Sequence, residues 1–213
     1  MKRQVTPKCR LGGRRALWAA SAAVMLLGSC ATSPVAPEAQ AVPEESLFEP
    51  GKLKPVDSVL KVKVGERVPD FTLPTVSGTR VSLSQFRGKK NVVIAFVPAA
   101  FTPVCSAQYP GYNIALDLFE RHDAVLLGMT TDNLPSLHAW ETAMGGLDFE
   151  LLSDFWPHGK VTSEYGVLRS DGTCERALMV IDKQGVLRYV DVHDINKRPP
   201  LEDLAAALAD LKG

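Results

Sequence analysis

Two continuous apolar runs constrain the fold of this chain more than any other feature of its sequence. Residues 91–97 (NVVIAFV) and 124–129 (AVLLGM) are apolar apart from Asn91 and lack the alternation of a half-exposed strand. Such runs are typical of strands that are buried on both faces, in a sheet that helices cover on both sides. The chain is therefore predicted to be an α/β protein with a central sheet.

The segments around these runs alternate between strand and helix patterns. We predict further strands at 70–73, 80–83, 149–152, 177–181 and 186–192, the last two joined as a hairpin, and helices from about residue 103 and at 134–143, 158–165 and 201–211. This order predicts a mixed central β-sheet flanked by helices. It is compatible with a thioredoxin-like fold, although periodicity alone does not select that fold over other α/β folds.

The N-terminus carries the pattern of an export signal. Residues 1–15 are basic, and residues 16–29 are uncharged but shorter than the roughly 20 apolar residues of a membrane span. LGSC at 27–30 resembles a bacterial lipobox, so we predict a signal peptide at 1–29 and a lipidated Cys30 that anchors the protein to a membrane. An ordinary cleaved signal followed by a chance cysteine is the alternative.

Residues 30–60 are predicted to be an extended tether, and residues 61–213 the folded domain. Prolines at 34, 37, 43, 50 and 55 fix φ and remove hydrogen-bond donors, so neither helix nor sheet is expected there. Ala31 follows Cys30, which by lipoprotein usage indicates the outer membrane of a Gram-negative host. We therefore expect an exported protein in the bacterial envelope that faces the periplasm.

Charge and composition exclude several functional classes. Basic and acidic residues both number 24, but six of the basic ones precede the first acid, Glu38. The rest of the chain is acidic, which does not suit a nucleic-acid binder. Its four cysteines are too few for a disulfide scaffold, and its four histidines show no ligand spacing, so we expect neither a metal nor another cofactor.

A chemical motif directly follows the strand at 91–97. Pro98, Thr102 and Cys105 have the spacing P-x-x-x-T-x-x-C, and here the chain resembles the peroxiredoxin family over essentially all of 65–211. The resemblance implies a thioredoxin-like fold and a thiol-dependent peroxidase. It also implies that Cys105 is the peroxidatic cysteine and that Pro98, Thr102 and Arg176 activate it.

Elementary chemistry agrees with these roles. Pro103 suits the first position of a helix, which would place Cys105 where free N–H groups and the helix dipole stabilise a thiolate. Arg176 would add a permanent cation, and Thr102 a hydroxyl within reach of the peroxide. The alternatives are an inert buried Cys105 and an Arg176 that pairs with a nearby carboxylate, Glu175 or Asp182.

Three further residues are candidates for the site. Gln108 matches a family position that usually holds Glu or Gln, and Trp156 matches an often aromatic position near the pocket, where ordinary packing is the alternative. Cys174 is the possible resolving cysteine, and its distance of two residues from Arg176 predicts that both side chains face the same side of the sheet. We nevertheless expect one-cysteine behaviour, in which Cys105 is the only cysteine of the chain that takes part in the catalytic cycle.

Pro110, followed by Gly111, is predicted to interrupt the helix that begins near residue 103.

The sequence thus predicts an enzyme that reduces hydrogen peroxide and organic hydroperoxides through a sulfenic acid on Cys105, which an external thiol or thioredoxin-like reductant returns to the thiol. A homodimer is a possible assembly. The alternative function is a membrane-tethered peroxide sensor or redox relay that passes oxidation to a partner without turning over peroxide.

Overall fold

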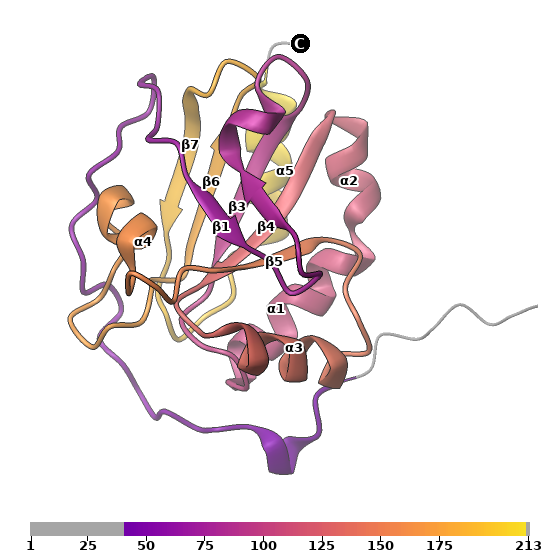
Figure 1. Ribbon diagram of the computed structural model, residues 1–213, viewed down its shortest axis with the longest axis vertical. Helices are drawn as coiled ribbons and strands as arrows, with labels where there is room; N and C mark the ends of the chain where they lie inside the picture. Colours follow the sequence, from indigo (N-terminus) through magenta and orange to yellow (C-terminus); the bar gives the residue numbers. More distant parts are fainter. Residues whose placement is uncertain (1–40, 212–213) are drawn as a thin grey trace, which may run out of the picture. The chain divides into compact units, whose positions relative to one another are not determined.

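The computed structural model describes residues 41–211, which fold around a five-stranded sheet (Figure 1). Its strand order is β5-β4-β3-β6-β7, in which β3, β4 and β5 are parallel and β6 and β7 are antiparallel additions. A separate hairpin pairs β1 with β2. The strands are β1 (Thr72–Pro74), β2 (Arg80–Ser82), β3 (Asn91–Phe96), β4 (Ala124–Thr130), β5 (Glu150–Ser153), β6 (Ala177–Ile181) and β7 (Leu187–Val192).

The helices follow the predicted order, with three additional short helices. They are η1 (Glu44–Ser46), η2 (Leu83–Phe86), α1 (Pro103–Ile114), α2 (Leu116–Arg121), α3 (Leu134–Ala143), α4 (Lys160–Tyr165) and α5 (Leu201–Ala209). The two short 3-10 helices and the separate helix α2 were not predicted. Among residues 41–211, no helix is both long and apolar enough to cross a bilayer. The predicted signal peptide at 1–29 and Cys30 lie outside the described residues.

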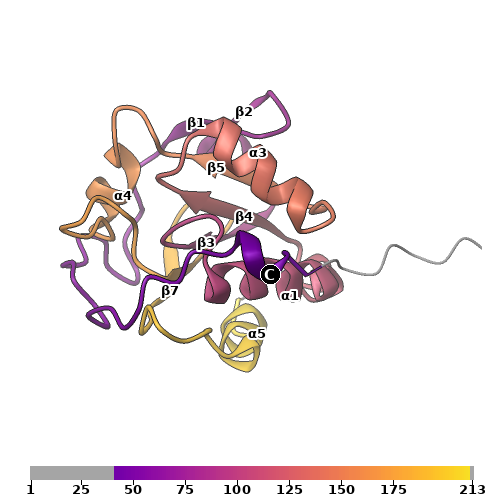
Figure 2. The same cartoon turned by 90° about the horizontal axis from the view of Figure 1, so that it is seen from below.

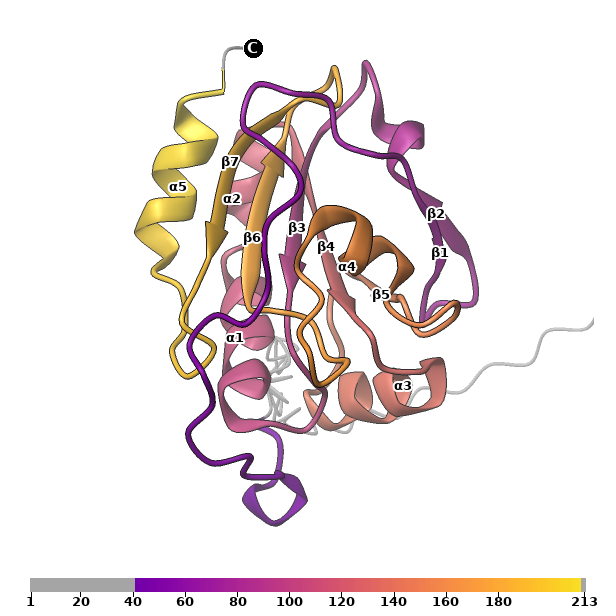
Figure 3. The same ribbon diagram turned by 90° about the vertical axis from the view of Figure 1, so that its left-hand side faces the viewer.

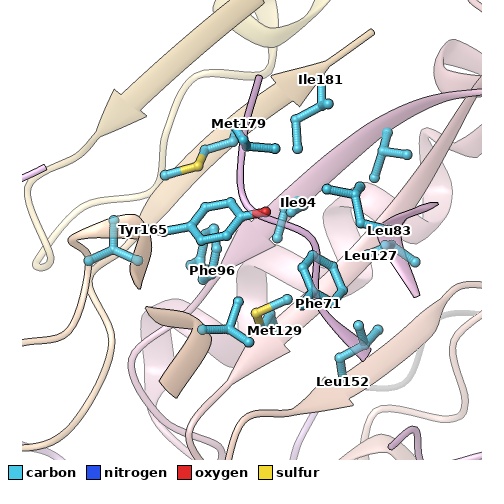
Figure 4. Close-up of a cluster of buried hydrophobic side chains, with 14 of the residues drawn as sticks. Phe71, Leu83, Ile94, Phe96, Leu127, Met129, Leu152, Tyr165, Met179 and Ile181 are labelled. Atoms are coloured by element: carbon cyan, nitrogen blue, oxygen red, sulfur yellow. The ribbon is translucent and has the colours of Figure 1, made fainter. Parts of the chain in front are cut away.

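Side chains alternate between two hydrophobic cores on the two faces of the sheet. On β3, Ile94 and Phe96 join one core, while Val93 and Ala95 join the other. The first core lies under the β1–β2 hairpin and α4, where Tyr165 packs on Phe96 (Figure 4). The second lies under α1 and α5, and Figure 2 shows these helices on the side of the sheet opposite the hairpin. Burial on both faces explains the continuous apolar runs.

Strand register brings distant parts of the chain to one end of the sheet. Phe96 at the end of β3 pairs with Ala177 at the start of antiparallel β6. The loop that follows β3 and the residues that precede β6 therefore meet at this edge. Ligands of open α/β sheets bind outside the carboxyl ends of parallel strands, which makes this edge the expected place for a site.

Helix α1 continues through Pro110, so the predicted interruption is wrong. Proline removes only one backbone hydrogen bond, and tertiary contacts on both sides of it hold the helix. The Tyr109 hydroxyl donates to the Ala95 carbonyl at 2.9 Å, and the ring of Tyr112 packs against Phe119. The helix instead ends at Ile114, before α2.

The segment at residues 42–57, here called the strap, was predicted to be part of an extended tether without secondary structure. It contains η1 and lies against the domain, passing alongside α1 in Figure 3. Val42 is buried in the second core, and the Leu53 amide donates to Asn196 Oδ1 at 2.9 Å. Proline-rich composition excludes a regular backbone ladder but not individual contacts, so folded structure begins well before the predicted boundary at residue 61.

Candidate active site

The motif residues lie in the loop and first helical turn that follow β3. Phe101 has a φ of +55°, an unusual conformation for a residue other than glycine and one that concentrates at functional sites. Asp132 fixes the loop by accepting a hydrogen bond from the Ala100 amide at 2.8 Å. Thr102 is the N-cap of α1, and Pro103 is its first residue. The loop thus turns sharply into the helix that carries the cysteine.

The hydroxyl of Thr102 points back into the loop, where it donates to the Ala99 carbonyl at 2.9 Å. It makes no capping bond to the first turn of α1. The first N–H groups of the helix therefore remain available, with the positive end of its dipole, to stabilise negative charge near Cys105. The oxygen lone pairs of Thr102 remain available to accept a hydrogen bond from a ligand.

Cys105 and Arg176 are in direct contact. Arg176 Nη2 lies 3.4 Å from Cys105 Sγ, and both side chains are buried. Two further bonds fix the guanidinium, because Nη1 donates to Gln108 Oε1 at 2.5 Å and Nε donates to the Ile195 carbonyl at 3.1 Å. A rigidly held cation at this distance stabilises a thiolate.

Arg176 forms no ion pair with a carboxylate within residues 41–211. Glu175, one of the two predicted competitors, pairs with Arg169 at 2.6 Å, and Asp182 pairs with Arg188 at 2.6 Å. The partners of Arg176 are neutral oxygens and the sulfur. Its positive charge therefore acts on whatever occupies the site.

Gln108 is fixed from its other side by Tyr112. Gln108 Nε2 donates to the Tyr112 hydroxyl at 3.2 Å, which leaves Oε1 directed at Arg176. Burial raises the pKa of Tyr112 to about 12, so this hydroxyl is neutral at physiological pH. A chain of hydrogen bonds from α1 thus orients the guanidinium, and it brings the candidate residue Gln108 into contact with Arg176.

A cavity of about 430 Å³ opens at this end of the sheet. Three of the predicted residues, Pro98, Thr102 and Arg176, line it, and we call it the Arg176 pocket. Strap residues, among them Phe48 and Leu53, complete its lining. Cys105 is buried directly beside the guanidinium that lines the pocket.

Cys174 faces the other core, contrary to the expectation that it shares the side of Arg176. It packs in the first core with Phe96, whereas Cys105 packs in the second. Its Sγ–H donates to the Val97 carbonyl at 2.8 Å, and burial raises the pKa of this thiol well above its usual value. The chain between Cys174 and β6 departs from regular strand alternation, which explains the difference.

Trp156 does not line the pocket. Its side chain is 81% exposed in the loop between β5 and α4, so the structure does not bring it to the other predicted site residues. Conversely, two residues that contact the site, Asp132 and Ile195, were not predicted from the sequence. Asp132 follows the end of parallel strand β4, a position that could have signalled it. Ile195 acts through its carbonyl, which no sequence pattern reveals.

Comparison with known proteins agrees with this geometry. A sequence profile of the AhpC/TSA family matches residues 64–190, more than half of the chain. The chain belongs to the AhpC/TSA family of peroxiredoxins. The peroxiredoxin is 37% identical over 132 residues to alkyl hydroperoxide reductase E of Mycobacterium tuberculosis, covering 62% of this chain and 86% of that one. It is 35% identical over 147 residues to bovine peroxiredoxin-2, covering 64% and 72%.

Solved structures show the same thioredoxin-like fold. The reduced 2-Cys peroxiredoxin of Plasmodium vivax superimposes on the peroxiredoxin with a TM-score of 0.64 at 29% identity, covering 68% of this chain and 80% of that one. The peroxidoxin BcpB of M. tuberculosis gives a TM-score of 0.62 at 26% identity, covering 71% and 99%. The predicted fold class and the thiol peroxidase family are thus confirmed. The relatives of the chain include 2-Cys peroxiredoxins.

Proposed function

We propose that this peroxiredoxin reduces hydrogen peroxide and organic hydroperoxides at Cys105. The thiolate attacks the terminal oxygen of the hydroperoxide, so that an S–O bond forms as the O–O bond breaks. Cys105 becomes a sulfenic acid, and the other oxygen leaves with the electron pair, taking up a proton to give water or an alcohol. The sulfur is oxidised and the peroxide is reduced by two electrons.

The contact between Arg176 Nη2 and Cys105 Sγ at 3.4 Å carries this proposal. During the attack, negative charge moves from sulfur to the leaving oxygen, and a cation beside both atoms stabilises the thiolate and the transition state. Gln108 and the Ile195 carbonyl hold the guanidinium in place, so little reorganisation is needed when the charge moves. Thr102 lines the same pocket with lone pairs that can accept a hydrogen bond from the peroxide O–H group.

We further propose that an external thiol or thioredoxin-like reductant completes the cycle. A first thiol condenses with the sulfenic acid to give a mixed disulfide and water, and a second thiol releases Cys105. The position of Cys174 in the opposite core supports one-cysteine behaviour.

The sequence around Cys30 supports a lipid anchor in the bacterial envelope, at the outer membrane and facing the periplasm. A homodimer is the assembly that fits the family.

Steady-state peroxide consumption by the full-length chain tests the proposal. With dithiothreitol as reductant, we expect many turnovers of hydrogen peroxide per protein and none in Cys105→Ser. A single rapid oxidation followed by a mixed disulfide with a protein partner, without continued consumption, would instead identify a redox relay. Release of Cys30→Ala from membranes, with peroxidase activity retained, tests the anchor separately.

A further inference from the structure

Part of the wall of the Arg176 pocket is built by residues outside the family region. The profile match begins at residue 64, but strap residues Phe48 and Leu53 line the same cavity as Thr102 and Arg176. The strap is therefore in a position to contact any ligand that reaches the guanidinium.

Backbone hydrogen bonds hold the strap in this position. The Phe48 amide donates to the carbonyl of Phe101 at 2.7 Å, in the strained loop before α1. Leu53 exchanges two bonds of 2.9 Å with the side chain of Asn196, and the Asp57 amide donates to buried Glu175 at 2.6 Å. Because these anchors use the backbone of the strap, its pocket-lining side chains do not hold it in place and can serve a ligand.

The pocket is larger and more apolar than hydrogen peroxide requires. One water occupies about 30 Å³ in the liquid, so a cavity of about 430 Å³ exceeds a two-oxygen substrate several-fold. Apolar side chains supply most of its walls, with the polar groups of Thr102 and Arg176 beside them. The ring of Phe48 is 69% exposed although it lines the cavity. An apolar ligand group would cover this surface and stabilise the complex.

We propose that the strap is a specificity-determining element, which binds the apolar group of a bulky organic hydroperoxide and directs its O–O bond to Cys105. The inference rests on the proposed peroxidase function and adds a preferred substrate class to it. Phe48 and Leu53 contact the organic group, while Arg176 and Thr102 receive the peroxide oxygens.

Truncation of the two side chains in the full-length chain tests this inference. We expect Phe48→Ala and Leu53→Ala each to lower the ratio of kcat/KM for cumene hydroperoxide to kcat/KM for hydrogen peroxide by about ten-fold, a usual effect of trimming an apolar pocket. Val59→Ala is the matched control, because Val59 is 81% exposed and does not line the pocket. Its ratio should equal that of the wild type.

Binding of cumyl alcohol, the product that keeps the apolar group, gives a second readout without turnover. We expect the reduced wild type to bind it and both strap variants to bind about ten-fold more weakly. Unchanged ratios and unchanged binding in both variants would overturn the inference, as would an equal loss of rate with both peroxides. A wild type that binds the alcohol but reduces neither peroxide would overturn the peroxidase function and leave the binding pocket standing.

Discussion

Cys105 and Cys174 are both fully buried, yet their sulfur atoms face groups of opposite polarity. Cys105 lies in the first turn of α1 with the guanidinium of Arg176 at 3.4 Å, and both features favour a thiolate. Cys174 donates a hydrogen bond to the Val97 carbonyl at 2.8 Å, and burial, together with the negative charge of Asp132, raises the pKa of this thiol. The neighbours of a buried thiol, rather than its burial, thus decide whether it reacts.

The largest expected effect distinguishes the two cysteines directly. Cys105→Ser should lower kcat/KM for hydrogen peroxide by about 10⁴-fold or more, since a hydroxyl cannot replace the thiolate nucleophile. Cys174→Ser should retain kcat/KM within about two-fold, because its sulfur lies in the other core. Peroxide consumption with dithiothreitol measures both. Loss of activity in a folded Cys174→Ser would contradict the contrast drawn here.

Removing the positive charge of Arg176 should make Cys105 react slowly with peroxide, as we expect of Cys174. Arg176→Met keeps the bulk of the side chain and should lower the rate constant for reaction with peroxide by about 10²-fold to 10³-fold. Arg188→Met is a matched control, since Arg188 is a half-exposed arginine of β7 that pairs with Asp182. Stopped-flow tryptophan fluorescence follows the reaction. Equal rates for Arg176→Met and Arg188→Met would mean that Arg176 is only structural.

Gln108 should act through Arg176 as a positioning residue. Gln108→Leu removes the acceptor at 2.5 Å from Nη1 and should slow the reaction with peroxide by about ten-fold, the usual cost of a hydrogen bond to a charged group. Gln108→Glu keeps an acceptor at this position and should restore most of the rate. A rescue that fails, with both variants equally slow and equally stable to heat, would show that the amide does more than orient the guanidinium.

The smallest effect concerns stability at alkaline pH. Cys174 keeps its proton in the folded protein, whereas the same thiol in the unfolded chain ionises above about pH 9. Unfolding then releases a proton, so the free energy of unfolding falls as pH rises, by up to about 1.4 kcal/mol per pH unit. Urea denaturation between about pH 8 and about pH 10.5 should therefore show a shallower decline of the free energy of unfolding in Cys174→Ala than in the wild type. Parallel declines would mean that Cys174 is not a neutral thiol.

Much of the fold was predictable because it depends on local patterns. The nearly continuous burial of β3 and β4 produces their apolar runs, and α3 was predicted at its observed bounds, Leu134–Ala143, from its periodicity and Pro135. The interruption at Pro110 was predicted wrongly because long-range contacts of Tyr109 and Tyr112 outweigh one lost backbone bond. Local propensity decided the outcome only where tertiary packing did not oppose it.

The site was predictable in part for the same reason. Pro98, Thr102 and Cys105 belong to one local motif. The position of Arg176 beside Cys105 depends instead on the pairing of β3 with β6, and only the family resemblance predicted it. The place of the strap in the pocket depends on a bond between Leu53 and Asn196, which are 143 residues apart. No pattern in a single sequence encodes such a contact.

One measurement tests the central contrast most directly. The reduced full-length chain is treated with one equivalent of hydrogen peroxide in the presence of dimedone, and its cysteine peptides are identified by mass spectrometry. We predict that dimedone labels the Cys105 peptide as a trapped sulfenic acid and that Cys174 is recovered as an unmodified thiol. A disulfide between Cys105 and Cys174, or a label on Cys174, would contradict the account.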